Sequence, residues 1–305
     1  MSASLGTVVV FGGSGFIGRQ VVKRLAQAGA RVIIPSRRPG LLSWMKVAGD
    51  VGQVLPIVTD TRYDASVAAA VTGADAVINL IGILAPSGRD SFDGVQHQAA
   101  SRIARAAAAA GARHFVQISA IGADAASPSA YARSKAAGEA AVRAAMPDAV
   151  ILRPSIVFGP GDGFFNRFGQ MAKVLPFLPL IGGGHTRFQP VYVGDVADAV
   201  MVALTDPACA GKTYELGGPR AYSFKELLDY IRHQSGVPRR LLLTLPFPVA
   251  MLQAFFMELL PGKPLTRDQV TLLRRDNVIS GALPGLTDLG ITPKAVELVV
   301  PTYLR

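Results

Sequence analysis

Short apolar runs and helix-patterned segments alternate along the first half of the chain. The runs lie at 7–11, 31–35, 56–60, 74–82 and 113–120, and alanine-rich segments with apolar residues at helical spacing separate several of them. Strands covered by helices on both faces have this near-continuous apolar character. The pattern predicts an α/β fold with a doubly wound parallel sheet, which binds its ligand at the carboxyl ends of the strands.

A glycine-rich turn joins the first apolar run to the first helical segment. The run Thr7–Phe11 leads directly into Gly12-Gly-Ser-Gly-Phe-Ile-Gly18. Glycines permit a tight turn and a close approach of the backbone to a pyrophosphate, and the amino end of a helix attracts phosphate. Strand, turn and helix together favour a dinucleotide site over a purely structural turn. The predicted contacts are Gly12, Gly13, Ser14, Gly15, Phe16 and Ile17.

The second and third apolar runs end in polar residues that predict which nucleotide is bound. Ser36, Arg37 and Arg38 stand where an NAD-selective site carries an acidic residue. A guanidinium pairs well with a 2′-phosphate, so this turn predicts NADPH; a solvated basic turn is the alternative. Asp60 and Thr61 end the third run and are predicted to meet the adenine, although an aspartate after a strand is also a common helix cap.

Tyr131 and Lys135 are four residues apart in the stretch SAYARSKAAGE. On a helix this spacing places both side chains on one face, so that Lys135 can lower the pKa of the phenol and reach the nicotinamide ribose. Ser119 ends the fifth apolar run and could bind a substrate carbonyl beside the tyrosine. All three residues are expected on the cofactor side of the sheet.

These motifs resemble the short-chain dehydrogenase/reductase superfamily in its extended or atypical branch. The resemblance implies that Tyr131 donates or accepts a proton, that Lys135 assists it and binds the ribose, and that Ser119 holds the carbonyl. It also implies that residues 79–82 line the nicotinamide half of the site. The implied contacts in the later strands are Leu80, Ile81, Gly82, Ser119, Tyr131, Lys135 and Pro154.

A narrower resemblance runs nearly from end to end. The segments FGGSGFIGR, VQISAIGAD, SPSAYARSKAAGE, LRPSIVFGPGDGFFNRF, QPVYVGDVADAV and LGITPKAVELVVPTYLR are similar to the NADPH-binding accessory subunits of respiratory complex I and their bacterial relatives. This family implies a tightly held structural NADPH, other complex I subunits as partners, and a place in the peripheral arm near the membrane and the quinone site. It implies no independent turnover. A free-standing NADP-dependent reductase or nucleotide-sugar epimerase/dehydratase is the alternative.

The second half of the chain predicts a smaller lobe. We expect residues 1–158 and 186–218 to form the nucleotide domain, and 159–185 and 219–305 the smaller lobe. Residues 150–158 are expected to form one strand, and Asp195 is expected to cap the helix after QPVYV. Arg153, Asn166 and Arg187 are candidates for an anionic substrate or for salt bridges between the lobes.

Residues 241–260, LLLTLPFPVAMLQAFFMELL, are apolar except for Glu258 and a few uncharged polar positions. Twenty such residues could span a bilayer, but Pro246 and Pro248 leave only about a dozen for a helix. The segment therefore predicts a helix lying on a membrane surface or a partner, with a core helix as the alternative. Its predicted face is Val249, Leu252, Phe256, Leu259 and Leu260, with Arg239, Arg240 and Lys263 as flanking cations.

Charge and cysteine content narrow the remaining classes. The net charge is +10, but the basic residues form no concentrated stripe, so a nucleic-acid partner is not expected. The single cysteine, Cys209, forms no internal disulfide, and the start lacks a basic segment followed by an apolar one. The four histidines share no metal-ligand spacing, and no metal site is expected. We expect a peripheral protein on the cytoplasmic side of a bacterial inner membrane.

Overall fold

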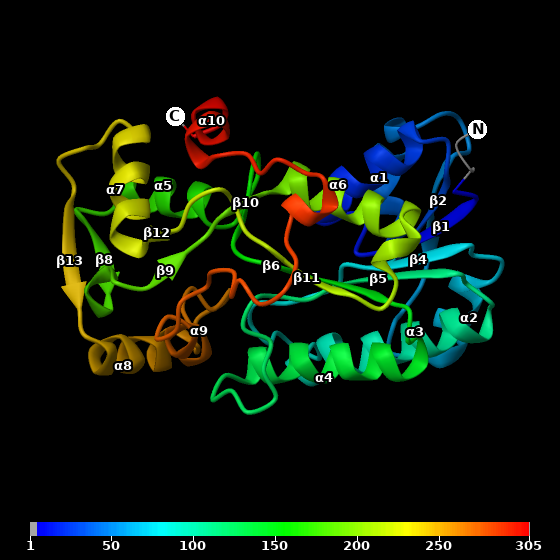
Figure 1. Ribbon diagram of the computed structural model, residues 1–305. Helices are drawn as coiled ribbons and strands as arrows, with labels where there is room; N and C mark the ends of the chain where they lie inside the picture. Colours follow the sequence, from blue (N-terminus) through cyan, green and yellow to red (C-terminus); the bar gives the residue numbers. More distant parts are fainter. Residues whose placement is uncertain (1–4, 305) are drawn as a thin grey trace.

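The computed structural model describes residues 5–304, and a seven-stranded parallel sheet forms its centre (Figure 1). The strand order is β11-β6-β5-β4-β1-β2-β3, and every neighbouring pair is parallel. The strands are β1 (Thr7–Phe11), β2 (Arg31–Ser36), β3 (Val54–Val58), β4 (Ala76–Asn79), β5 (His114–Ile118), β6 (Val150–Pro154) and β11 (Thr213–Leu216). The predicted doubly wound fold is confirmed. The order reverses between β4 and β1, which is where such sheets bind ligands.

Helices cover both faces of this sheet (Figure 1). One face carries α1 (Phe16–Gln27) and α6 (Val193–Thr205), and the other carries α2 (Asp64–Val71), α3 (Ala99–Ala109) and α4 (Ala130–Ala145). Successive residues of β1 enter different cores: Val8 and Val10 join the cluster on the α1 side, whereas Val9 and Phe11 join the opposite one. Burial on both faces explains why the strand is apolar at every position.

The remaining elements form what we call the C-terminal lobe, which lies at one end of the sheet (Figure 1). Its helices are α5 (Phe165–Val174), α7 (Phe224–Gln234), α8 (Phe247–Met257) and α9 (Arg267–Leu272), and α10 (Val296–Val299) packs against the same core. Its paired strands are β7 (Val157–Phe158) with β10 (Val191–Tyr192), β8 (Phe177–Ile181) with β13 (Leu241–Leu245), and β9 (Arg187–Phe188) with β12 (Tyr222–Ser223). A cluster of phenylalanines fills the centre of this core.

Two expectations about local structure are wrong. Residues 150–158 are not one strand, because β6 ends at Pro154 in the main sheet and β7 pairs with β10 instead. Asp195 does not cap α6, which begins at Val193. The buried Asp195 carboxylate instead accepts hydrogen bonds from the backbone N (2.7 Å) and the Nζ (3.3 Å) of Lys294. It therefore ties the first turn of α6 to the C-terminal part of the chain.

The apolar segment 241–260 divides at its prolines, as predicted. Its first part is the strand β13, which was not foreseen, and its second part is α8. Within α8 the buried residues are Ala250 and Ala254, and Phe247 and Met251 are partly buried against the same cluster, whereas the predicted apolar face is exposed. The exposed fractions are 49% for Val249, 61% for Leu252, 59% for Phe256, 74% for Leu259 and 53% for Leu260.

Two of the cations that flank segment 241–260 form hydrogen bonds within the chain. Arg240 and Lys263, expected as free flanking cations, donate to the backbone carbonyls of Ala172 and Pro86. Within residues 5–304, no helix has both the length and the apolar character needed to cross a membrane.

Candidate nucleotide-binding site

The glycine turn between β1 and α1 has the geometry of an anion cradle. Gly12 adopts a left-handed φ of +78°, and a Cβ on Gly18 would lie 2.2 Å from the carbonyl oxygen of Gly12. Both positions therefore require glycine. Within residues 5–304, no acidic residue lies in the first turn of α1 and no side chain caps it. Its backbone N–H groups are thus available to a phosphate, which the positive end of the helix dipole favours.

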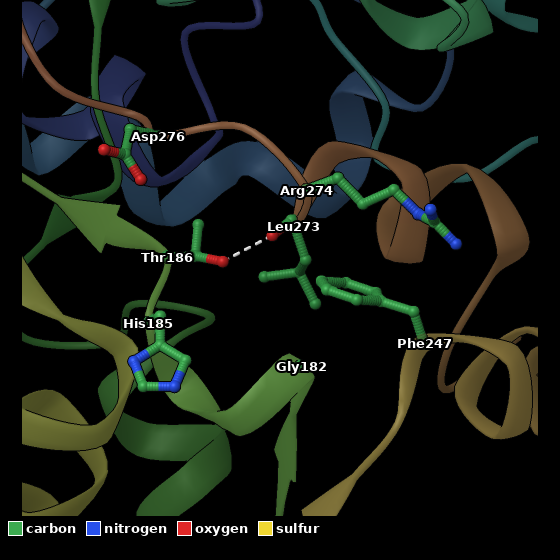
Figure 2. A pocket seen from close by; sticks show the side chains of 7 residues that line it. All are labelled: Gly182, His185, Thr186, Phe247, Leu273, Arg274 and Asp276. Carbon is green, nitrogen blue, oxygen red and sulfur yellow. Dashed lines mark hydrogen bonds between the residues drawn. The ribbon is translucent and has the colours of Figure 1, made fainter.

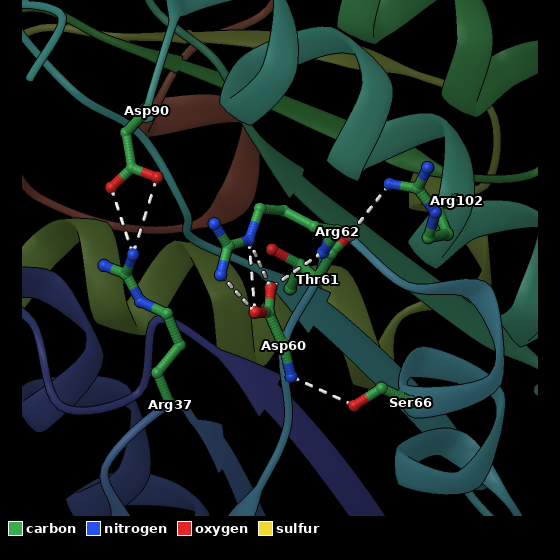
Figure 3. A network of polar contacts seen from close by, with 7 residues as sticks. All are labelled: Arg37, Asp60, Thr61, Arg62, Ser66, Asp90 and Arg102. Carbon is green, nitrogen blue, oxygen red and sulfur yellow. Dashed lines mark hydrogen bonds and ion pairs between the residues drawn. The ribbon is translucent and has the colours of Figure 1, made fainter. Parts of the chain in front are cut away.

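Polar side chains interact closely beyond the ends of β2 and β3 (Figure 3). Arg37 Nη1 donates to Asp90 Oδ2 at 3.1 Å, and the Ser36 hydroxyl accepts from the backbone N of Arg38 at 3.2 Å. Arg62 Nε lies 2.9 Å from Asp60 Oδ1, and this hydrogen bond holds the pKa of Asp60 at about 2. Asp60 is therefore an ionised acceptor at neutral pH. It does not cap α2, whose N-cap is Tyr63.

Thr61 continues this network towards α3. Its carbonyl oxygen accepts from Arg102 Nη1 at 2.8 Å, while the backbone N of Asp60 donates to the Ser66 hydroxyl at 3.0 Å (Figure 3). These contacts fix the loop after β3 in place. The sequence did not identify Arg62, Arg102 or Asp90 as members of this network.

The Lys135 side chain reaches from α4 to the carboxyl ends of β4 and β5, and Ser119 directly follows β5. Lys135 Nζ lies 5.9 Å from the centroid of the Tyr131 ring and 3.4 Å from the carbonyl oxygen of Ile118. A Cβ on Gly82 would lie 3.2 Å from the same Nζ, so the ammonium also faces the loop after β4. Ser119 is buried, and its Oγ has no hydrogen-bond partner within residues 5–304. A buried hydroxyl without a partner is unusual and suits a ligand atom.

Burial is the main cause of the pKa shifts of Tyr131 and Lys135. It raises the pKa of Tyr131 from 10.0 to about 12, with the charge of Asp268 as a second cause, and lowers the pKa of Lys135 from 10.5 to about 8. The pKa of the phenol is thus raised, not lowered, because burial disfavours the phenolate and the charge of Asp268 repels it. The assisting role of Lys135 stays a prediction. At pH 7 the phenol keeps its proton and can donate a hydrogen bond.

The amino end of α4, which carries Tyr131, is held by Asp268 of α9. The Asp268 carboxylate accepts from the backbone N of Ala130 at 2.7 Å, from the backbone N of Tyr131 at 3.3 Å and from the Ser129 hydroxyl at 2.8 Å. A carboxylate at this position also interacts favourably with the helix dipole. The C-terminal lobe thus positions the tyrosine. Sequence reasoning missed Asp268, because nothing near it in the chain identifies a partner 137 residues away.

The loop after β4 is fixed by buried amides. Asn79 Nδ2 donates to Gln117 Oε1 at 2.9 Å, and Asn79 Oδ1 accepts from the backbone N of Ile81 at 3.1 Å. Leu80 donates its backbone N–H to the carbonyl of Phe11 at 2.9 Å, and Pro154 ends β6. The residues predicted for the nicotinamide half therefore lie along one edge of the sheet. Their role as contacts stays a prediction.

The three candidates for an anionic substrate do not form one site. Arg153 makes a two-pronged ion pair with the buried Glu139, at 2.8 and 2.6 Å, which joins β6 to α4. The expected salt bridge from Arg153 to the smaller lobe is therefore wrong. Arg187 is exposed, whereas the Nδ2 of Asn166 is buried.

A cavity of about 380 Å³ lies in the C-terminal lobe, apart from the glycine turn (Figure 2). Figure 2 shows Phe247 beside Arg274, whose guanidinium carbon is 4.7 Å from the ring centroid. The lining residues are Gly182, His185, Thr186, Phe247, Leu273, Arg274 and Asp276. Within residues 5–304, no group of three or more His, Cys, Asp or Glu side chains is placed to hold a metal ion.

Comparison with known proteins supports a nucleotide-binding fold and a particular group of relatives. The model of the NAD dependent epimerase/dehydratase family matches residues 8–217. The structure of DesIV, a dTDP-glucose 4,6-dehydratase from Streptomyces venezuelae with NAD and TYD bound, superposes with a TM-score of 0.74 at 20% identity, covering 98% of this chain and 96% of that one.

Two curated proteins match beyond the family segment. Subunit 9 of the NADH dehydrogenase [ubiquinone] 1 alpha subcomplex, from Arabidopsis thaliana mitochondria, is 39% identical over 304 residues, covering 94% of this chain and 74% of that protein. A ceramide reductase from Caulobacter vibrioides is 35% identical over 251 residues, covering 80% of this chain and 74% of that protein. The first match therefore includes most of the C-terminal lobe.

Proposed function

Because this chain belongs to the NAD-dependent epimerase/dehydratase family, in the group that contains subunit 9 of the NADH dehydrogenase alpha subcomplex, we propose that it is an NADPH-holding accessory subunit of respiratory complex I. In this function the nucleotide is structural, and the chain supports the peripheral arm of the complex. The observation that carries the proposal is the set of exposed apolar side chains on α8 and just after it, because a contiguous apolar surface of this kind is typical of a docking site.

NADPH, rather than NADH, is favoured by the residues after β2. The turn presents the Ser36 hydroxyl and the guanidiniums of Arg37 and Arg38, and both arginines are exposed to a ligand. A 2′-phosphate can pair with a guanidinium through two parallel, charge-assisted hydrogen bonds. The 2′-hydroxyl that NADH carries at this position is uncharged and gains much less from the two arginines. When bound, the dinucleotide would add its own hydride chemistry to the site. Its pyrophosphate fits the amino end of α1.

The residues at the nicotinamide end can hold the nucleotide without turning over a substrate. Lys135 carries an ammonium within reach of the loop after β4, and Tyr131 keeps its proton as a hydrogen-bond donor. The unpaired Oγ of Ser119 offers a further polar contact. Each of these groups would bind the ribose and carboxamide of a resting cofactor. Their retention is therefore compatible with a structural role.

The C-terminal lobe supplies the docking surface in this proposal. The exposed apolar residues here are Val249, Leu252 and Phe256 of α8 with Leu259 and Leu260 just beyond its end, and we call them together the α8 face. Covering these side chains is favourable, because it removes apolar surface from water. Arg240 and Lys263 donate to backbone carbonyls of the chain and keep their charge, and Arg239 is exposed, so positive charge lies beside the apolar surface. The proposed partners are other complex I subunits and the adjoining membrane surface. The proposed place is the cytoplasmic side of a bacterial inner membrane, as a peripheral protein.

A second candidate function is an NADP-dependent carbonyl reductase with an apolar substrate. The observation that favours it is the intact set of Ser119, Tyr131 and Lys135, with a serine hydroxyl free to bind a carbonyl oxygen. The similarity to a ceramide reductase agrees with an apolar substrate. In such an enzyme the α8 face would border the entrance for a lipid chain.

Recovery of the tagged chain from native membranes separates these candidates. We expect complex I subunits to co-purify with it and the nucleotide released on denaturation to have the mass of NADP(H). Arg37→Ala with Arg38→Ala should reduce the NADPH content strongly, because the 2′-phosphate loses its partners. Arg31→Ala with Lys46→Ala removes two exposed cations elsewhere and should retain the nucleotide. A chain that purifies alone, or with NADH, would contradict the proposal.

A further inference from the structure

A loop after β4 crosses the proposed nucleotide site, and we call residues 83–92 the strap. At its tip Ser87 and Asp90 exchange backbone hydrogen bonds of 3.0 and 2.9 Å around Gly88, which has a φ of +57°. The strap leaves the end of β4 and reaches Arg37 after β2. Because β1 lies between β4 and β2 in the sheet, the strap passes the carboxyl end of β1, where the glycine turn lies.

The near part of the strap is tied to the C-terminal lobe and to the helix that follows it. Lys263 Nζ donates to the carbonyl of Pro86 at 2.7 Å, and Gln269 Nε2 donates to that of Leu84 at 3.4 Å. Gln96 Nε2 holds the carbonyl of Ile83 at 3.0 Å. Lys263 has a φ of +43°, and among residues 5–304 it is the non-glycine residue with a left-handed backbone. The base of the strap is therefore firmly held.

The tip of the strap has a different kind of anchor. Asp90 Oδ2 and Oδ1 lie 3.1 and 3.5 Å from Arg37 Nη1, and the Arg37 side chain is 62% exposed (Figure 3). Such surface ion pairs contribute little and exchange partners readily. The Asp90 carboxylate therefore pairs with the same guanidinium that is proposed to bind the 2′-phosphate.

We infer that Asp90 is a specificity-determining residue that competes with the 2′-phosphate of NADPH for Arg37. The inference rests on the proposed function, in which Arg37 binds that phosphate. A phosphate arriving at Arg37 displaces and repels the Asp90 carboxylate, which frees the tip of the strap from the sheet edge. NADH has no group to displace it and leaves the ion pair in place. Asp90 therefore weakens the binding of NADPH but not of NADH.

Asp90→Asn tests this competition, with Asp93→Asn as its matched control. Asp93 lies just beyond the strap and is the same residue type, but its carboxylate contacts His97 and Gln98 rather than Arg37. The purified full chain, freed of nucleotide, is titrated with NADPH or NADH, and the nucleotide fluorescence reports binding. We expect Asp90→Asn to tighten NADPH about three- to fivefold, as loss of a competing ion pair worth up to about 1 kcal/mol allows. NADH affinity, and both affinities of Asp93→Asn, should stay within about twofold.

A double-mutant cycle identifies the partner of Asp90. In an Arg37→Ala background the effect of Asp90→Asn should vanish, because the competed group is gone. An effect that persists there, an equal change for both nucleotides, or weaker NADPH binding by Asp90→Asn would overturn the inference. If the wild-type chain prefers NADPH and Asp90→Asn changes nothing, the inference alone fails. A wild-type chain without that preference would overturn the proposed NADPH function and the inference with it.

Discussion

Charging the α8 face is a direct perturbation of the proposed docking surface. Leu252 and Phe256 are 61% and 59% exposed, so a partner that covers them completely removes more than half of each side chain from water. Full burial of such a side chain contributes about 1.5–3 kcal/mol, which leaves about 1–2 kcal/mol for each residue on docking. Leu252→Asp with Phe256→Asp should therefore cost at least about 2–4 kcal/mol, or about 30- to 1,000-fold in affinity.

The double variant should fold, because α8 packs on the lobe through Ala250 and Ala254, with Phe247 and Met251 partly buried beside them, and neither substituted residue is in that set. Association is measured by fractionating membranes and by co-purification of complex I subunits, and folding by thermal melting and bound NADPH. Val47→Asp with Val51→Asp is the matched control, since these residues are 87% and 107% exposed outside the C-terminal lobe. We expect the α8 variant to leave the complex with its NADPH retained, and the control to remain attached.

Either of two results would show that the α8 face is not a docking surface. A variant that melts early and loses its nucleotide would mean that the α8 face is core in the assembled protein. A variant that stays attached as firmly as the control would mean that docking uses another surface. In wild-type membranes, alkaline carbonate should remove the chain, because α8 has 11 residues and is too short to span a bilayer.

Two further predictions concern the nicotinamide end. Burial lowers the pKa of Lys135 to about 8, so the ammonium that would donate to a ribose hydroxyl is lost as the pH rises through 8. The affinity of the wild-type chain for NADPH should therefore fall between pH 7.5 and 9.5. Binding isotherms of Lys135→Met should lack that fall. Asp268→Ala removes three hydrogen bonds from the amino end of α4, so its free energy of unfolding, measured by chemical denaturation, should be lower by about 1–3 kcal/mol. Asp268→Asn should lose less. Equal stability of Asp268→Ala and wild type would contradict the capping role.

The sheet was predictable because its signals are local. The inner strands of the N-terminal half, such as β1 and β4, are buried on both faces, which makes each of them an apolar run between helices. Strand β11, Thr-Tyr-Glu-Leu, was not predicted, since four residues with a buried glutamate resemble no apolar run. The two-residue strands of the C-terminal lobe, such as β7 and β9, have no periodicity to detect. Strand β13 was missed because its exposed leucines do not alternate with polar residues.

The candidate site was predictable only where its residues are neighbours in the chain. The glycine turn and the pair Tyr131 and Lys135 depend on spacings within one element, which a sequence displays. Asp90 and Asp268 reach the site from segments 53 and 137 residues away from their partners, and no spacing indicates them. The raised pKa of Tyr131 was not predicted either, because it results from burial, and burial is a property of the packed fold.

Tyr131→Phe in the assembled complex tests whether the chain holds NADPH without using it, as proposed. The variant loses one hydroxyl, so bound NADPH and NADH:quinone activity should both stay at wild-type levels. Gly15→Val is the counterpart. The φ of Gly15, −73°, suits any residue, and a Cβ there would lie 3.2 Å from the Gly12 oxygen, so the turn can adjust. The valine side chain would, however, enter the place proposed for the pyrophosphate. This variant should lose both NADPH and activity. A carbonyl reduction that wild type performs with NADPH and Tyr131→Phe does not would contradict the claim.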